Sequence, residues 1–207
     1  NAIEVEDAAK ILRSRGLAMQ DAVPQGLGGM AAIIGLDINA VKKTLSSMSS
    51  LEVCEVANDN EHRQVVISGN LKKVEKAMLA LKAIGARRTL LLPVSAPFHC
   101  SLMKPAANHM KELINNLKVS PVSIPIVSNV TATQISTPSE IKTLLIKQIT
   151  HTVRWRESIL FLSNCNVQNF IEFGAGRVLG GLVKRILPEA SISNAGETME
   201  IKKLMEV

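Results

Sequence analysis

Between residues 28 and 94 the chain alternates short apolar runs with segments of helical period, and this order restricts its fold more than any other feature. Short apolar runs bounded by turn signals predict strands, and apolar residues at helical spacing predict helices. Asp37 is a candidate N-cap of the first helix, and Gly85 is a candidate end residue of the second. The predicted order is strand 30–36, helix 37–47, strand 52–57, turn 58–60, strand 64–68, helix 71–84 and strand 88–94. This βαββαβ order predicts a ferredoxin-like subdomain at residues 28–94, a layout that hosts many unrelated functions.

The flanking parts of the chain also alternate between the two periodicities. The predicted helices cover 5–23, 102–117, 139–149, 155–163 and 178–187, and the predicted strands cover 124–127, 169–173 and 190–194. Strands that alternate with helices are typical of α/β domains with a mainly parallel sheet. We therefore expect residues 1–27 and 95–207 to form one larger α/β domain, into which the ferredoxin-like subdomain is inserted.

The composition limits the classes of partner. Hydrophobic residues make up 46% of the chain and charged residues 20%, which is typical of a globular protein and argues against a disordered one. The net charge of +6 favours an acidic protein, a phosphorylated cofactor or nucleic acid, although a solvated basic surface without a partner explains it equally well. With no Tyr, one Trp and four Phe, the chain lacks the exposed aromatic residues on which single-stranded nucleic acid stacks.

Other sequence features bear on location and metal binding. No apolar stretch is long enough to span a bilayer, and the acidic start of the chain does not resemble a signal peptide. The three cysteines, Cys54, Cys100 and Cys165, cannot all pair, and none lies in a C-x-x-C motif. We expect a cytoplasmic protein with no membrane partner, no nucleic-acid partner and no metal.

His99 is the strongest candidate for chemistry among the four histidines. It follows a predicted strand that runs into Pro-Val-Ser-Ala-Pro-Phe, and it precedes the next helix. Catalytic side chains of α/β proteins often occupy such loops, where a neutral imidazole can take a proton from a hydroxyl group. The alternative is a buried histidine bonded to the backbone. His62, His109 and His151 lie in polar surroundings and are expected to be surface residues.

The sequence does not supply an evident nucleophile for His99. A serine nucleophile of an α/β enzyme is expected in a G-x-S-x-G turn, and no such turn occurs. Cys100 adjoins His99, but neighbouring side chains usually diverge, and a small buried thiol is the simpler interpretation. Arg15, on the first helix, could hold a carboxylate through two parallel hydrogen bonds, although a solvated helix arginine is the default interpretation.

Several segments together resemble malonyl-CoA:acyl carrier protein transacylases of the free-standing bacterial type. The matching segments occur in the family's order and cover nearly the whole chain: residues 13–16, 19–20, 22–24, 26, 29–33, 64–69, 92–100, 102–106, 126–130, 153–155, and 172–176 through 182–186. The resemblance implies a hydrolase-like α/β domain, here incomplete, and an acyltransferase that moves malonyl from malonyl-CoA to acyl carrier protein in fatty acid biosynthesis. It also implies a CoA thioester substrate, no bound cofactor and, we expect, a monomer.

The resemblance assigns roles to four positions. His99 matches the general base of a Ser–His dyad, and Arg15 matches the residue that binds the malonyl carboxylate. Phe98 matches the residue associated with malonyl in preference to bulkier branched acyl groups. The family typically orients its histidine through a backbone carbonyl, and the matching position lies near Arg154.

One departure from the family is large. The family's G-Q-G-S segment and its G-H-S-L-G nucleophile turn have no counterpart among these residues, so we expect this chain alone to be inactive. A fragment, an upstream part that is not represented, and a naturally shortened protein all explain the difference. The rival hypotheses are a non-catalytic protein-binding module and a degenerate paralogue that retains Arg15 and His99.

Overall fold

The computed structural model describes residues 2–48 and 51–206, and it shows a mixed α/β protein, as the sequence predicts. The chain divides into two compact units, residues 1–155 and residues 156–207, and each is described by itself. The division predicted from the sequence, in which residues 28–94 interrupt a larger domain, stays a prediction. No helix in the described part of the chain is both long enough and apolar enough to cross a bilayer.

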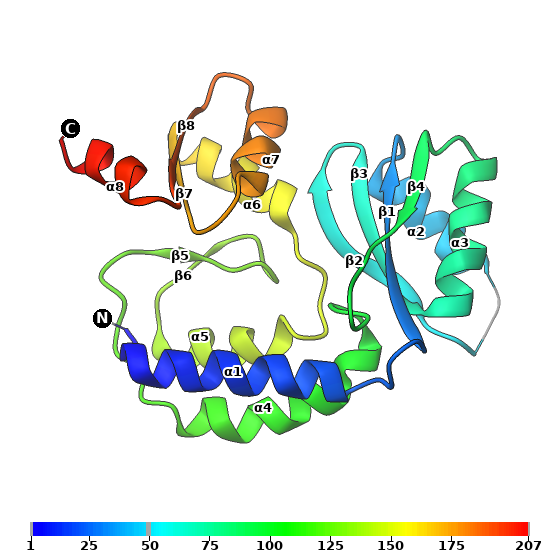
Figure 1. Ribbon diagram of the computed structural model, residues 1–207, viewed down its shortest axis with the longest axis horizontal. Helices are drawn as coiled ribbons and strands as arrows, with labels where there is room; N and C mark the ends of the chain where they lie inside the picture. Colours follow the sequence, from blue (N-terminus) through cyan, green and yellow to red (C-terminus); the bar gives the residue numbers. More distant parts are fainter. Residues whose placement is uncertain (1, 49–50, 207) are drawn as a thin grey trace. The chain divides into compact units, whose positions relative to one another are not determined.

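A four-stranded antiparallel sheet organises the first unit (Figure 1). Its strands lie in the order β2-β3-β1-β4, with β1 paired to both β3 and β4. Helices α2 and α3 connect the strands, and the element order is the βαββαβ of ferredoxin-like folds. The elements are β1 (Gly28–Ile34), α2 (Ile38–Ser47), β2 (Cys54–Glu61), β3 (Gln64–Asn70), α3 (Leu71–Ala83) and β4 (Arg88–Leu91).

The two faces of this sheet bury different sets of side chains. Because successive side chains of a strand point to opposite faces, Ala31 and Ile33 pack under α2 and α3, whereas Met30 faces the other way. The helix-covered face also includes residues from both helices, among them Val41, Leu45, Val74, Ala77 and Leu81. On the opposite face Met30, Ala57 and Val66 meet Leu92 and Phe98, which come from the segment after β4.

Strand β2 extends further than the sequence predicts. The predicted turn at residues 58–60 is wrong, because these residues continue the strand and the turn falls at residues 62–63. The physical reason is pairing with a distant residue: Val153 donates to the carbonyl of Ala57 at 2.8 Å and accepts from the N–H of Asp59 at 2.9 Å. Backbone groups at the edge of β2 are thus satisfied by a segment that lies far away in the sequence.

Three helices of the first unit pack around a second apolar cluster. In Figure 1, α1 lies beside α4, and the two helices are in contact. Met19 from α1, Met110 from α4 and Ile149, just after α5, are among its buried members, and Phe98 packs against this cluster as well as against the sheet. The elements are α1 (Val5–Asp21), the short 3-10 helix η1 (Ser101–Met103), α4 (Lys104–Asn116), α5 (Pro138–Lys147) and the hairpin strands β5 (Ile126–Val127) and β6 (Gln134–Ile135).

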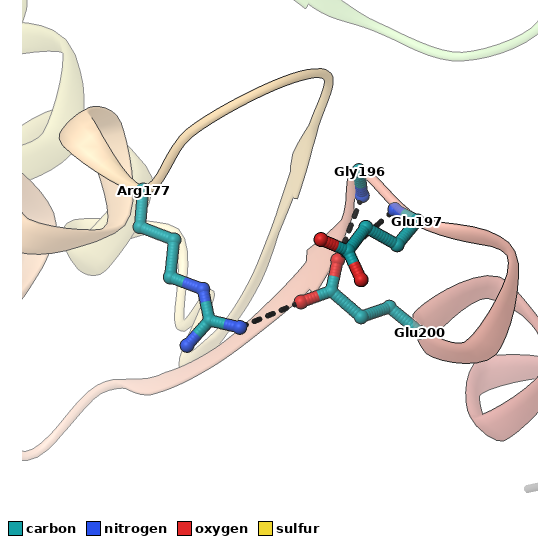
Figure 2. A network of polar contacts seen from close by, with 4 residues as sticks. All are labelled: Arg177, Gly196, Glu197 and Glu200. Atoms are coloured by element: carbon teal, nitrogen blue, oxygen red, sulfur yellow. Dashed lines mark hydrogen bonds and ion pairs between the residues drawn. The ribbon is translucent and has the colours of Figure 1, made fainter.

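In the second unit β7 and β8 pair in parallel, and this is the strand direction that the sequence predicts for the larger domain. The Glu172 carboxylate accepts hydrogen bonds from the backbone N–H groups of Leu179 and Gly180 at the start of α7. Figure 2 shows Arg177 reaching Glu200, whose carboxylate also accepts from the N–H groups of Gly196 and Glu197. The elements are α6 (Trp155–Asn164), β7 (Asn169–Phe173), α7 (Val178–Ile186), β8 (Ser191–Ala195) and α8 (Thr198–Met205).

Candidate active site

The loop between β4 and η1 presents His99 in an unusual backbone conformation. His99 has φ = 58°, in the left-handed region that residues with a Cβ rarely occupy. The two preceding residues anchor the loop, because Pro97 is fully buried and Phe98 packs into both apolar clusters. A left-handed non-glycine residue persists where surrounding contacts enforce it, and such residues concentrate at functional sites.

The His99 imidazole is half-buried and is held by one backbone group. Its Nδ1 lies 2.8 Å from the carbonyl oxygen of Gln148, which can only accept, so Nδ1 carries the hydrogen and Nε2 is left as an acceptor. Burial lowers the pKa of His99; the bond to Gln148 acts in the opposite direction, and the charge of Arg15 lowers the pKa further. The ring is therefore neutral at pH 7 with its basic nitrogen available, which is the state a general base requires.

The residue that orients His99 is Gln148, and the prediction of a carbonyl near Arg154 is wrong. Gln148 is the C-cap of α5, where the last carbonyls have no partner within the helix. Arg154 acts elsewhere: its N–H donates to the carbonyl of Asn129 at 2.9 Å, and its guanidinium donates to the carbonyls of Val130 and Thr131. Arg154 thus holds the turn that follows β5.

Arg15 lies on α1 between Ile11 and Met19, which pack in the same apolar cluster as Phe98, and its charge lowers the pKa of His99. Its guanidinium is partly buried, and burial lowers the pKa of Arg15. The buried Nε atom of Arg15 has no hydrogen-bond partner among the residues that the structure describes. A buried guanidinium N–H that lacks a partner is costly unless an acceptor joins it, so this side chain is suited to bind an anion.

The remaining candidates do not form a second centre. His62 is exposed, His109 lies 3.4 Å from the hydroxyl of Ser14, and Nδ1 of His151 lies 2.7 Å from the carbonyl of Lys147. Cys100 donates to the carbonyl of Pro97, and burial raises the pKa of its thiol. In residues 2–48 and 51–206 no hydroxyl or thiol bonds to Nε2 of His99, and no cluster of His, Cys, Asp and Glu could hold a metal ion.

Known proteins are similar to this chain in both sequence and fold, although no family model matches it. A malonyl CoA-acyl carrier protein transacylase of Salmonella typhimurium is 40% identical over 195 residues, which cover 94% of this chain and 63% of that protein. The structure of the malonyl CoA-acyl carrier protein transacylase from Coxiella burnetii matches this fold with a TM-score of 0.96 at 34% sequence identity. The match covers 100% of this chain and 65% of the Coxiella chain. A malonyl-transacylase solved in complex with a type II polyketide synthase acyl-carrier protein has a TM-score of 0.95 at 36% identity, over 99% of this chain and 66% of its own.

The mixed α/β fold and the sequence similarity place the chain in the transacylase class of α/β proteins. Within that class, the chain belongs to the malonyl CoA-acyl carrier protein transacylase family. It spans slightly less than two thirds of the length of the relatives above.

Proposed function

We propose that the protein containing this chain transfers malonyl from malonyl-CoA to acyl carrier protein, with His99 as the general base. The observation that carries the proposal is the His99 imidazole, held through Nδ1 by Gln148; the charge of Arg15 acts on this ring, and the buried Nε of Arg15 lacks a partner among the described residues. A merely structural histidine needs neither a left-handed backbone nor a charged neighbour with a buried N–H that lacks an acceptor. Both features favour catalysis over a non-catalytic binding module.

The proposed reaction has two transfer steps. A serine hydroxyl, supplied by a part of the protein outside these 207 residues, attacks the thioester carbonyl while Nε2 of His99 takes its proton. The proton is then given to the departing CoA thiolate, and the malonyl group is left on the serine. In the second step His99 takes the proton of the phosphopantetheine thiol of acyl carrier protein, which attacks the malonyl-serine ester, and the proton returns to the serine.

Arg15 and Phe98 set the proposed acyl selectivity. The malonyl group carries a second carboxylate, which the guanidinium of Arg15 binds during both steps. Phe98, packed between the two apolar clusters, limits the space for branched acyl groups. The proposed substrate is a CoA thioester, and the enzyme needs no resident cofactor. The net charge of +6 complements the acidic surface of the carrier protein. The proposed reaction takes place in the cytoplasm.

A transfer assay tests this proposal. The protein at its natural length is mixed with malonyl-CoA and phosphopantetheinylated acyl carrier protein, and malonyl-carrier protein is measured by gel shift or mass spectrometry. We expect catalytic formation of the product with the native protein and at least a 100-fold loss in His99→Ala, since general-base catalysis contributes about 10²–10⁴-fold. Equal rates for the native protein and His99→Ala would contradict the assignment.

A further inference from the structure

Glu55, on strand β2, holds the residue that lies two positions after His99. One carboxylate oxygen of Glu55 accepts from the backbone N–H of Ser101 at 2.9 Å, and the other accepts from its hydroxyl at 2.7 Å. Both oxygens of one carboxylate are therefore used on a single residue, 46 positions away in the sequence. This contact ties the four-stranded sheet to the His99 loop.

The turn at His99 is held from three directions. Upstream, Pro97 packs so closely on Gly28 that a Cβ at Gly28 would lie 2.4 Å from its ring. The imidazole is tethered by the carbonyl of Gln148. Downstream, the backbone is fixed at Ser101 by Glu55, so relaxation of the left-handed φ of His99 would have to break one of these contacts.

We propose that Glu55 is a positioning residue for His99. By fixing Ser101, its carboxylate keeps the turn in the conformation that points Nδ1 at Gln148 and leaves Nε2 free to accept a proton. The competing role is simpler: Glu55 would only stabilise the start of η1, which begins at Ser101. The catalytic consequence rests on the function proposed above, whereas the effect on the ring can be measured without it.

The test is a nitrogen-15 NMR measurement of the His99 ring in this chain. Glu55→Ala removes the charge and both acceptor oxygens. Glu55→Gln also removes the charge but keeps one amide oxygen that can accept from Ser101. Ser101→Ala removes only the hydroxyl donor. We expect the native ring in the Nδ1–H tautomer, a mixture of tautomers in Glu55→Ala, a smaller change in Ser101→Ala, and a ring close to native in Glu55→Gln.

The corresponding rates are measured in the protein at its natural length. Because a displaced catalytic group slows catalysis up to about 100-fold, we expect kcat to fall at least about tenfold in Glu55→Ala, with KM for malonyl-CoA unchanged. Glu55→Gln is expected to recover most of the rate. A purely structural role would lower the free energy of unfolding in Glu55→Ala without altering the tautomer of the folded protein.

The outcomes separate the two proposals. If Glu55→Ala folds and His99 keeps its native tautomer, the positioning role is overturned. If Glu55→Ala does not fold, Ser101→Ala decides, because an unchanged ring in that variant overturns the role and a partial shift supports it. If the tautomer shifts as expected but the native protein transfers no malonyl, the positioning role stands and the proposed function fails.

Discussion

Nδ1 of His99 lies 2.8 Å from the carbonyl oxygen of Gln148, and this contact sets the direction in which the imidazole can exchange a proton. A carbonyl oxygen accepts and cannot donate, so the neutral ring keeps its hydrogen on Nδ1. Where many α/β enzymes orient the base with a carboxylate, this chain uses the end of α5. A neutral partner stabilises the imidazolium less than a carboxylate would, and this agrees with a ring that stays neutral near pH 7.

The first prediction concerns the pH dependence of stability. Because burial lowers the pKa of His99 in the folded protein below the ordinary value of 6.5, the unfolded chain binds this proton more readily. The stabilisation from neutral His99 is complete above pH 6.5 and is lost as the pH falls through the folded pKa. Urea unfolding between pH 7.5 and pH 5 should show stability falling towards low pH, with a shallower fall in His99→Gln.

A histidine substitution at an exposed site is the matched control for that experiment. His62→Gln should leave the pH dependence as it is in the native chain, because His62 lies exposed in the turn between β2 and β3. If His99→Gln and the native chain lost stability equally between these pH values, the lowered pKa of His99 would be refuted.

Arg15 should determine the preference for malonyl. Its guanidinium can pair with the second carboxylate of malonyl, a group that acetyl lacks, and a hydrogen bond to a charged group contributes about 1.5–3 kcal/mol. In the protein at its natural length, Arg15→Ala should lower kcat/KM for malonyl-CoA about 10- to 100-fold and leave acetyl-CoA nearly unaffected. Arg13→Ala, an exposed change on the same helix, is the control. An equal loss for both donors would contradict the role.

Two glycines should respond to alanine in opposite directions. Gly16 lies inside α1 with no atom near the position of a Cβ, so Gly16→Ala should raise the free energy of unfolding by about 0.5–1 kcal/mol. A Cβ at Gly69 would lie 2.0 Å from the carbonyl oxygen of Val53, so Gly69→Ala should lower the free energy of unfolding by about 1–3 kcal/mol. Urea denaturation of both variants checks the signs, and destabilisation by Gly16→Ala would be inconsistent with the helix described here.

The cysteines should differ sharply in reactivity. Burial raises the pKa of Cys54 to about 12 and also raises that of Cys100, whereas Cys165 is exposed. Because the thiolate is the reactive form, a disulfide reagent at pH 8 should modify one thiol rapidly in the folded chain and the other two only after unfolding. Cys165→Ser should abolish the rapid phase. Rapid modification that persists in this variant would show that a buried thiol is accessible.

Much of the fold follows from short-range rules that can be applied to the sequence. The Asp37 side chain caps α2 by accepting from two backbone N–H groups, Gly85 has a positive φ at the end of α3, and Pro105 lies in the first turn of α4. The roles of Asp37 and Gly85 were predicted, because each depends on residues only a few positions apart. The turn at residues 58–60 was mispredicted because Val153, far along the chain, pairs with that segment.

The site was predictable only where a side chain carries the signal. His99 and Arg15 have distinctive chemistry and matched a known family, so both could be singled out. The carbonyl of Gln148 could not be identified, because every residue has a carbonyl group and only the end of α5 leaves this one available. The left-handed φ of His99 was also unpredictable, since glycine is the residue that normally marks such a position.

The most direct measurement is the intact mass of the natural-length protein after brief exposure to malonyl-CoA without acyl carrier protein. The proposed mechanism predicts an added malonyl group, located on a serine by peptide mapping, that forms quickly in the native protein and slowly in His99→Ala. Addition of phosphopantetheinylated acyl carrier protein should then remove it. A folded protein that acquires no malonyl group would contradict malonyl transfer through His99.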